Sequence, residues 1–242
     1  MVLQNTEFII LVTGRYHWLI PALAYFHGKY MPVPLTLFSD RLVEGFNAIE
    51  VFPLDMHIYQ EPCGKLIKDA LQRIDKPVVM FGYMDLLPSR KVDLRLLEVL
   101  EQYMMDDSHA ARGNLWAPAD NSVKSSNDIL REGDGFSIRK LPSTDQHIGQ
   151  IGSSSLLPAL WRKDFLLEFI EDGWTFDAIE YPGQHKFMAQ NKWYSVAMLP
   201  GLVETCHMCY TSDKRIVRLS TILNEEDRAY VSQFVPEWAI ID

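Results

Sequence analysis

The apolar run from Val78 to Leu87 limits the fold of this chain more than any other stretch. It is short, starts with β-branched residues and follows Pro77, which is typical of a buried strand bounded by turns. A single acid, Asp85, lies near its end, and a charged turn with Pro88 comes after it. Ligands bind at the carboxyl ends of central strands in open α/β sheets, so Asp85 is a candidate site residue. The alternative is that Asp85 only caps the turn or the next helix.

The chain around this run alternates apolar runs with amphipathic segments. We expect further strands at Glu7–Val12, Val33–Phe38 and Ala48–Phe52, and helices at Trp18–Lys29, Lys65–Ile74 and Asp93–Met105. Pro21 fits only the first turn of a helix, which places the first helix start close to His17–Leu19. Strands that alternate with helices predict an α/β fold with a central, mostly parallel mixed sheet flanked by helices.

The second half of the chain shows a weaker pattern. From Trp116 to Ile148 no periodicity is visible, and a polar stretch of this length predicts a functional loop or a mobile segment. Later helices are expected at Leu156–Ile170, at Phe187–Lys192, and from an Asn224 cap to about Phe234. Extended segments are expected at Trp193–Leu199, Val203–Tyr210 and Ile216–Leu219. The sequence has no repeat and no clear linker, so we expect residues 1–242 to form one domain.

Composition argues against several classes of protein. The 242 residues carry a formal net charge of −9, which disfavours broad, non-specific binding to nucleic acid. Three cysteines, an odd number, do not make a disulfide framework, and a reducing compartment is the simpler interpretation. Residues 1–7 lack a basic signal-peptide start, and the apolar segment Trp18–Phe26 is far shorter than the ~20 residues that span a bilayer. We therefore expect a soluble, cytoplasmic protein without a membrane span.

Several catalytic motifs are missing from the sequence. Neither glycine-rich phosphate loop, G-x-x-x-x-G-K-[ST] or G-x-G-x-x-G, is present, so a Walker-type ATPase and a dinucleotide-binding enzyme are poorly supported. A G-x-S-x-G nucleophile elbow is missing as well. Cys206 and Cys209 form a C-x-x-C pair, but a structural zinc site needs a second pair, and Cys63 is alone. Buried thiols beside a strand are therefore favoured over zinc.

The remaining candidate site consists of acids near the ends of expected strands: Asp40, Asp85, Asp177 and Glu180. Basic residues lie in loops nearby: Arg15, Lys65, Lys68, Arg90 and Lys186. Carboxylates that hold a divalent ion, together with Arg or Lys, would stabilise the negative charge that develops on a diphosphate leaving group. A separate carboxylate near the acceptor would act as general base. Each residue alone is better explained as a surface charge, and only their joint placement favours a site.

Four blocks of the sequence match a known family in order and spacing. They are Ile9–Tyr16 with Leu19–Tyr25, then Val78–Asp93, Ser155–Leu167 and Trp174–Asp177. The first resembles a strand, a D/G-R-Y loop and an L-P-x-F-A-Y helix, and the second a strand, a D-D-Y-x-L turn and an x-V-D helix start. The third is similar to S-L-Q-A-A-x-W-R-R-D-x-L-L, and the fourth to W-E-F-E. Through these blocks the chain resembles GT-A type glycosyltransferases, including uncharacterised phage and bacterial glycosyltransferase-like proteins.

The resemblance implies an enzyme that moves a sugar from a nucleotide-sugar donor, UDP-linked, to an acceptor. The acceptor would be a glycan, a small molecule or a hydroxymethylated DNA base. The residues that we expect to contact the donor are Arg15, Tyr16, Asp40, Lys65 and Asp85. Asp177, with Glu180 as second choice, would take the acceptor proton. Residues 1–110 would then form the nucleotide-binding half, and residues 111–242 the acceptor and catalytic half.

Three positions depart from the family pattern: Met84, Leu157 and Asp177. Met84 replaces the first acid of the D-D pair, so a divalent ion, Mn²⁺ or Mg²⁺, would have Asp85 alone from this motif. The alternative function is therefore an inactive module with the glycosyltransferase fold that binds a nucleotide or a glycan. A sugar-nucleotide nucleotidyltransferase is a third reading, but it needs a glycine-rich signature that Thr13–Arg15 does not provide.

Overall fold

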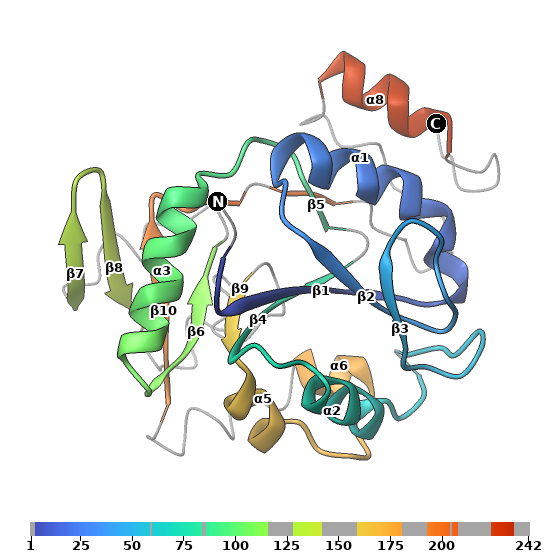
Figure 1. Ribbon diagram of the computed structural model, residues 1–242, viewed down its shortest axis with the longest axis horizontal. Helices are drawn as coiled ribbons and strands as arrows, with labels where there is room; N and C mark the ends of the chain where they lie inside the picture. Colours follow the sequence, from blue (N-terminus) through green and yellow to red (C-terminus); the bar gives the residue numbers. More distant parts are fainter. Residues whose placement is uncertain are drawn as a thin grey trace.

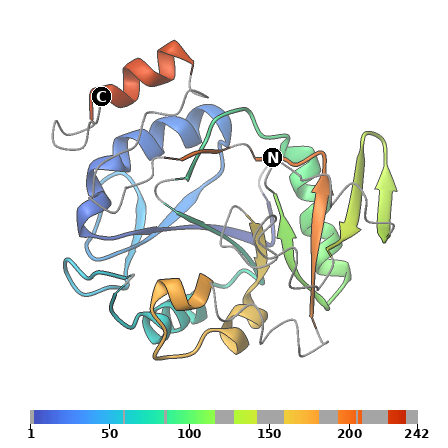
Figure 2. The same ribbon diagram turned by 180° about the vertical axis from the view of Figure 1, so that it is seen from behind.

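The computed structural model describes residues 3–58, 60–83, 86–115, 128–141, 159–180, 193–203, 205–207 and 224–234. Within these residues one sheet of nine strands, in the order β3-β2-β1-β4-β9-β6-β10-β8-β7, has helices on both faces (Figures 1 and 2). Its strands are β1 (Thr6–Val12), β2 (Leu35–Ser39), β3 (Asn47–Glu50), β4 (Val78–Tyr83), β6 (Ala110–Asn114), β7 (Ile129–Gly133), β8 (Phe136–Lys140), β9 (Ala159–Arg162) and β10 (Tyr194–Leu199).

Helices are found between several of these strands and near the end of the chain. They are the 3₁₀ helix η1 (Gly14–Leu19) and the α-helices α1 (Ile20–Tyr30), α2 (Gly64–Gln72), α3 (Leu94–Asp106), α5 (Lys163–Phe169), α6 (Phe176–Glu180) and α8 (Glu225–Ser232). Pro21 lies in the first turn of α1, as expected. Asp93 caps α3 by accepting hydrogen bonds from the backbone N–H groups of Arg95 and Leu96.

The sheet is mixed, which confirms the predicted α/β class. β3, β2, β1 and β4 are parallel neighbours, and β6 and β10 are parallel to each other. β9 lies between β4 and β6 and is antiparallel to both, so all six of those strands run in one direction. The hairpin β7–β8 completes the sheet through an antiparallel pairing of β8 with β10.

Side-chain alternation along β1 divides the core between the two faces of the sheet. Phe8 packs with α3, and Ile10 and Val12 pack with α1, all on the same face. Ile9 and Leu11 point to the other face, where α2, α5 and α6 cover the sheet. Figure 1 shows this division, with α1 above the sheet and α2, α5 and α6 below it. A central strand buried on both faces explains why β1 is an unbroken apolar run.

The predicted helix at Leu156–Ile170 is wrong in part, because its middle is a strand. Residues Ala159–Arg162 form β9, and α5 begins only at Lys163. All four β9 side chains are buried, so a helical periodicity could not be distinguished there from a short buried strand. Arg162 donates to the carbonyls of Met104 and Asp107 at the C-terminal end of α3, so this arginine of the third block has a structural role.

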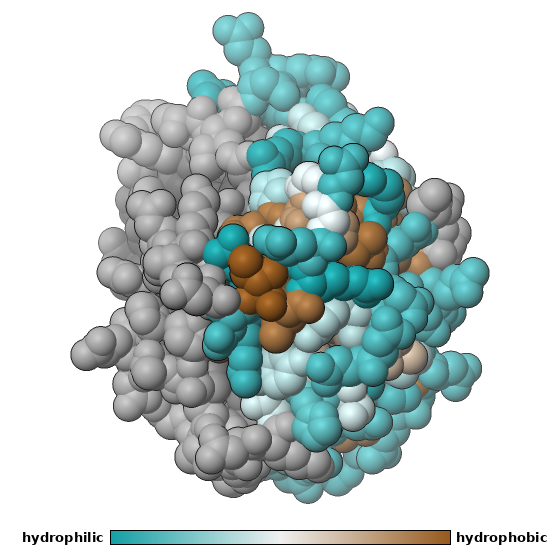
Figure 3. Space-filling model, turned by 90° about the vertical axis from the view of Figure 1, so that its left-hand side faces the viewer, coloured by the Kyte–Doolittle hydropathy of each residue, from teal (hydrophilic) through white to brown (hydrophobic). Residues whose placement is uncertain are grey.

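The predicted loop from Trp116 to Ile148 contains the β7–β8 hairpin, which the sequence analysis missed. Asp134 and Gly135 form its turn, and Gly135 has a φ of +75°, a conformation that favours glycine. Asp-Gly between two strands is a hairpin signal, but every residue of β7 is exposed, so no apolar alternation revealed the strand. Figure 3 views this side of the molecule, where Ile129 and Leu130 are 43% and 39% exposed.

The apolar run from Val78 to Leu87 divides into two strands of different sheets. β4 ends at Tyr83, and β5 (Leu86–Pro88) pairs with β11 (Thr205–His207) in a separate two-stranded sheet. The pairing is antiparallel and places His207 opposite Leu86. The helix predicted at 187–192 and the extended segment predicted at 216–219 lie outside the described residues. None of the helices in the described part of the chain has the length and apolar character needed to cross a membrane.

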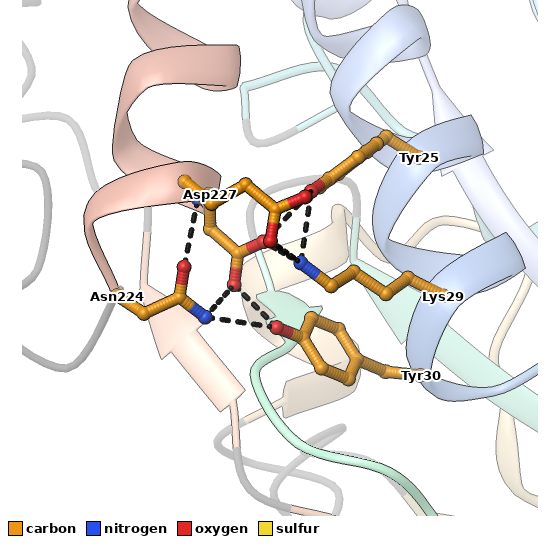
Figure 4. A network of polar contacts seen from close by, with 6 residues as sticks. Tyr25, Lys29, Tyr30, Asn224 and Asp227 are labelled. Atoms are coloured by element: carbon orange, nitrogen blue, oxygen red, sulfur yellow. Dashed lines mark hydrogen bonds and ion pairs between the residues drawn. The ribbon is translucent and has the colours of Figure 1, made fainter.

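The C-terminal helix α8 is attached to α1 through a buried carboxylate. Asp227 accepts hydrogen bonds from Lys29 Nζ (2.7 Å), Tyr25 Oη (3.0 Å), Tyr30 Oη and Asn224 Nδ2 (2.8 Å). Figure 4 shows these side chains converging on Asp227 between the two helices. Asn224 also caps α8, as the sequence predicts, because its Oδ1 accepts the Asp227 N–H.

Candidate functional site

The carboxyl end of β1 lies where a doubly wound sheet binds ligands. β1 has β2 on one side and β4 on the other, and all three are parallel. The helices that follow β1 and precede β4, α1 and α2, cover opposite faces of the sheet. The chain passes outward from β1 to β2 and β3 and then returns to β4 on the far side of β1, so the strand order reverses between β1 and β4 and their carboxyl ends form a topological switch point.

Asp40, directly after β2, organises the loops at this edge. Its Oδ2 accepts hydrogen bonds from the backbone N–H groups of Gly14 (2.8 Å) and Asp55 (3.0 Å). Its Oδ1 lies 2.7 Å from His17 Nε2 and 3.1 Å from Arg41 Nε. Because an ionised carboxylate only accepts, His17 Nε2 carries the proton in this pair. These groups, with Asp40 at their centre, are called the Asp40 network below.

The carboxyl group of Asp40 is held in its ionised form. Burial works against the charge and would raise the pKa, but hydrogen bonds from Arg41, His17 and the Asp55 N–H outweigh burial and hold the pKa below its usual range. The side chain has no exposed surface. Four protein groups already occupy its acceptor sites, so the geometry gives Asp40 a positioning role. Its predicted contact with the nucleotide stays a prediction.

Gly14 is needed where β1 ends because another loop approaches its backbone closely. A Cβ atom at this position would lie 2.4 Å from Asp55 Oδ1 and 3.2 Å from Asp55 Cα. The residue thus starts η1 and brings the loop that contains Arg15 and Tyr16 against the Asp40 network. Tyr16 is half-buried, and its N–H donates to Thr13 O (2.8 Å). The predicted residues Arg15, Tyr16 and Asp40 therefore lie at one edge, although the Arg15 side chain is outside the described part of the structure.

Arg41, His17 and Asp55 belong to the Asp40 network but were not selected from the sequence. Arg41 Nη2 lies 3.0 Å from Asp55 Oδ1, and the Arg41 side chain is 44% exposed, so its guanidinium reaches solvent at the edge of the sheet. The hydrogen bond to Asp40 raises the pKa of Arg41. Asp40–Arg41 directly after a strand was a visible signal for Arg41. Asp55 has no comparable signal, because its loop meets Asp40 only through the fold.

Lys65 lies outside the Asp40 network. It is on the first turn of α2, 63% exposed, and its Nζ pairs with Asp69 Oδ2 at 2.6 Å. Its backbone N–H donates to the carbonyl of Asp172 (3.1 Å), which ties α2 to the segment before α6. The structure therefore places Lys65 beside the elements that carry the proposed base, and not beside Asp40.

Asp177 and Glu180 lie on α6, which is connected to the Asp40 network through the chain from Val51 to Ile58. The N–H of Phe176, the first residue of α6, donates to the carbonyl of Ile58 (2.9 Å). The N–H groups of Cys63 and Gly64 both donate to Trp174 O (2.8 and 2.9 Å). The backbone of α6 is thus near the carboxyl edge of the sheet. The side chains of Asp177 and Glu180 are outside the described part of the structure.

A divalent ion is not accommodated by the described residues alone. Asp85 and Met84 lie outside them, and so does Cys209 of the C-x-x-C pair. Among the described side chains, no three His, Cys, Asp or Glu converge on a point where a metal could bind. Cys63 is buried, which raises the pKa of its thiol to about 12 and makes it an unreactive core residue.

A hollow of about 580 Å³ lies elsewhere and contains none of the predicted site residues. It is lined by Gln4, Asn5, Arg95, Glu98, Val99, Glu101, Gln102 and Arg131. Glu101 at its base is buried and accepts the Asn5 N–H (3.0 Å). Because its arginines are matched by carboxylates, this hollow has no net charge preference and we do not assign it to the site.

Comparisons with known proteins reveal likenesses of fold. Neither a protein family nor a curated protein matches the chain. TarS 1–349 of S. aureus in complex with UDP-GlcNAc is 12% identical with a TM-score of 0.49, over 98% of this chain and 68% of that chain. Glucosyl-3-phosphoglycerate synthase from Mycobacterium tuberculosis, in complex with Mn²⁺, UDP and glucosyl-3-phosphoglycerate, is 11% identical with a TM-score of 0.48, over 98% and 81%.

A third solved structure is CMP:2-keto-3-deoxy-manno-octonic acid synthetase complexed with CTP. It is 14% identical with a TM-score of 0.42, over 82% of this chain and 93% of that chain. Some other matched chains are longer, and this chain spans 37–60% of them. The three structures hold UDP-GlcNAc, UDP and CTP, respectively.

Proposed function

We propose that this protein is a glycosyltransferase that moves a sugar from a UDP-linked donor to an acceptor hydroxyl. The observation that carries the proposal is the coincidence of the sequence blocks with the switch point of the sheet. The loop with Arg15 and Tyr16, the strand end with Asp40, and α6 with Asp177 come from distant parts of the chain and lie at one edge. This edge is where an open α/β sheet binds its ligand.

The roles we propose follow the chemistry of sugar transfer. Arg15, Tyr16 and the Asp40 network would bind the nucleotide, with Lys65 as a further donor contact. Asp85 would contact the diphosphate, where negative charge develops as the bond to the sugar breaks. Asp177, with Glu180 as second choice, would take the proton from the acceptor hydroxyl as it attacks the sugar. Residues 1–110 would bind the donor, and residues 111–242 would provide the acceptor side.

The donor is tested by incubation of the protein with UDP-sugars, with and without Mn²⁺, and measurement of released UDP. We expect release above the buffer rate with one donor, and a decrease of at least about 100-fold in the Asp177→Asn variant, because loss of a general base typically costs 10²–10⁴ in rate. UDP affinity should be unchanged in that variant. Release that does not depend on Asp177 and Glu180 would overturn the assignment of the base.

The acceptor class is separated by a second assay with the active donor. A glycan, a small molecule and a hydroxymethylated DNA duplex are offered in turn, and sugar incorporation is measured by mass spectrometry. The formal net charge of −9 opposes the approach of polyanionic DNA, so we rank a glycan or a small molecule first. The three cysteines are consistent with a reducing, cytoplasmic compartment as the place of the reaction.

A second candidate function is a binding module that has kept the fold and lost catalysis. The observation that favours it is Met84, which stands where the resembling family has an acid. Such a module would bind UDP or a UDP-sugar without releasing UDP. Isothermal titration with UDP-GlcNAc, followed by analysis of the recovered ligand, distinguishes the two: an intact ligand after long incubation favours the module.

A further inference from the structure

The segment from Val51 to Ile58, named the bridging loop here, touches both sides of the candidate site. At its start, the N–H groups of Val51 and Phe52 donate to Ser39 O (2.8 and 3.2 Å) at the end of β2. In its middle, the Asp55 N–H donates to Asp40 Oδ2 (3.0 Å). At its end, the Ile58 carbonyl accepts the Phe176 N–H (2.9 Å). One short segment thus joins the Asp40 network to α6.

The bridging loop is anchored in the core by alternate side chains. Phe52, Met56 and Ile58 are buried in the same cluster as Phe176 of α6. Leu54, by contrast, is 66% exposed at the tip of the loop. A shift of the buried side chains would therefore be transmitted to α6 by packing as well as by the hydrogen bond from Phe176, because close-packed cores transmit small displacements.

Asp55 adopts the one conformation in this loop that restricts residue type. Its φ is +58°, and it is the one non-glycine residue with positive φ in the described part of the chain. Aspartate is among the few non-glycine residues that tolerate this region, whereas a β-branched residue is strongly disfavoured there. The turn is closed by a hydrogen bond from the Met56 N–H to Pro53 O (3.1 Å). This turn aims the Asp55 N–H at Asp40.

We propose that Asp55 is a positioning residue that sets the course of the bridging loop and so holds α6, with Asp177, at a fixed place relative to the donor side of the site. Its catalytic meaning rests on the proposed function. The Asp55 carboxylate itself is 74% exposed, and its pair with Arg41 is an exposed ion pair of small energy. The backbone conformation of Asp55, and not its charge, is therefore the part that positions α6.

Two variants that both lack the carboxylate separate conformation from charge. Asp55→Gly keeps access to positive φ, whereas Asp55→Val does not. Hydrogen exchange of the Phe176 amide should accelerate about tenfold in Asp55→Val and change less than about twofold in Asp55→Gly, since the left-handed conformation costs a branched residue about a tenfold factor. Asp55→Ala, which carries a smaller penalty, replaces Asp55→Val if the latter does not fold.

The transferase reaction gives an independent readout. In Asp55→Val we expect kcat to fall about tenfold while KM for the donor changes less than about threefold, because Gly14, His17 and Arg41 still hold Asp40. In Asp55→Gly, which keeps access to positive φ, kcat should fall by a smaller factor than in Asp55→Val. A rise in donor KM without a fall in kcat would overturn the proposal, since Asp55 would then be a donor contact.

Failure of this proposal is distinguishable from failure of the proposed function. Equal exchange of Phe176 in the Val and Gly variants, or acceleration confined to residues 51–56, would overturn the positioning role whatever the enzyme does. If the unchanged protein turns over no UDP-sugar, the proposed function fails, and the exchange of Phe176 still decides whether the bridging loop holds α6.

Discussion

Two buried aspartates, Asp40 and Asp227, perform related tasks in different surroundings. Asp40 joins loops at the carboxyl edge of the sheet, and two of its hydrogen-bond donors are backbone N–H groups. Asp227 joins two helices, and its partners on α1 are side chains, Lys29 among them. A carboxylate held by backbone groups determines the path of the chain, whereas one held by side chains determines how finished elements dock. Asp40 thus fixes loops at the edge where we propose the site, and Asp227 attaches a helix.

The residues around Asp40 are also more exposed than those around Asp227. Beside Asp40, Arg41 is 44% exposed and Leu42 and Leu54 are 72% and 66% exposed, so the region presents charged and apolar groups to solvent. Beside Asp227, Val231 is fully buried, and Tyr25 stacks on Tyr230 with ring centroids 3.9 Å apart. Ligand sites are drawn from open regions on a rigid support, which again favours the Asp40 edge.

The largest effect is expected from Asp227→Ala. It leaves the Lys29 ammonium and two tyrosine hydroxyls without their shared acceptor, so the free energy of unfolding should fall by about 3 kcal/mol. Urea unfolding followed by circular dichroism measures the change. The matched control is Glu226→Ala, which removes an exposed partner of the same lysine and should cost less than about 0.5 kcal/mol. Equal losses in both variants would contradict the role of Asp227 in attaching α8 to α1.

A smaller effect is expected from Gly14→Ala at the other carboxylate. The added Cβ meets Asp55 at 2.4 Å from its Oδ1 and 3.2 Å from its Cα, so the loop must move, at a cost of about 1–3 kcal/mol. Gly28→Ala is the control: nothing lies within 4 Å of its added Cβ, and removal of a helical glycine should stabilise by about 0.5–1 kcal/mol. The melting temperatures of the two variants are the measurement. An unchanged melting temperature in Gly14→Ala would mean that the close approach of Asp55 to Gly14 does not require a glycine.

The two carboxylates should also be visible in the dependence of stability on pH. Burial opposes ionisation of Asp227, but hydrogen bonds from Lys29, Tyr30 and Tyr25 outweigh it, and the pKa lies below its usual range, as it does for Asp40. A depressed pKa contributes stability that is complete above the unfolded value of about 3.9 and is lost as the pH falls through the folded value. Unfolding free energies measured between pH 7 and pH 2 should therefore fall below about pH 4.

The same pH series, measured on two variants, shows which carboxylates cause the loss of stability in acid. Asp227→Asn and Asp40→Asn cannot ionise at these positions, so each should flatten part of the acid slope, and the double variant more than either. A slope that is unchanged in both would place the acid sensitivity at other carboxylates.

The smallest effect on stability is expected from Arg41→Met. Arg41 is exposed, so solvent screens its pairs with Asp40 and Asp55 and they should contribute little to stability. If Arg41 faces the donor, UDP affinity should nevertheless decrease by about tenfold, because a charged group that contacts a diphosphate contributes more than a surface pair. Isothermal titration of UDP is the measurement. Unchanged affinity would leave Arg41 as a support of Asp40 alone.

How much of this could be predicted depends on the kind of residue. β1, α1 and α3 follow from apolar periodicity, Pro21 and the Asp93 cap, because those signals are local. β9 was predicted as a helix because a fully buried run of four residues has no periodicity to show. The β7–β8 hairpin was missed because its exposed strand lacks an apolar face, although Asp134–Gly135 marked the turn.

Residues of the candidate site could be predicted only where they stand next to the end of a recognisable strand. Asp40 and Tyr16 stand beside recognisable strand ends, and the fold brings them to one edge. Asp55 and His17 become site residues only through hydrogen bonds to Asp40, across 15 and 23 positions of the chain. The placement of Lys65 apart from Asp40 likewise depends on the path of α2, which no local pattern reveals.

The most direct test of the contrast between the two carboxylates is UDP binding by isothermal titration to Asp40→Asn and Asp227→Asn. Asparagine at position 40 turns an N–H₂ group toward donors, so the loops should shift and UDP affinity should fall by at least about tenfold. Asparagine at position 227 weakens the attachment of α8 to α1, away from the Asp40 edge. UDP affinity should therefore stay within about twofold of the unchanged protein. Equal affinities in both variants, or a loss confined to Asp227→Asn, would contradict a nucleotide site at the Asp40 edge.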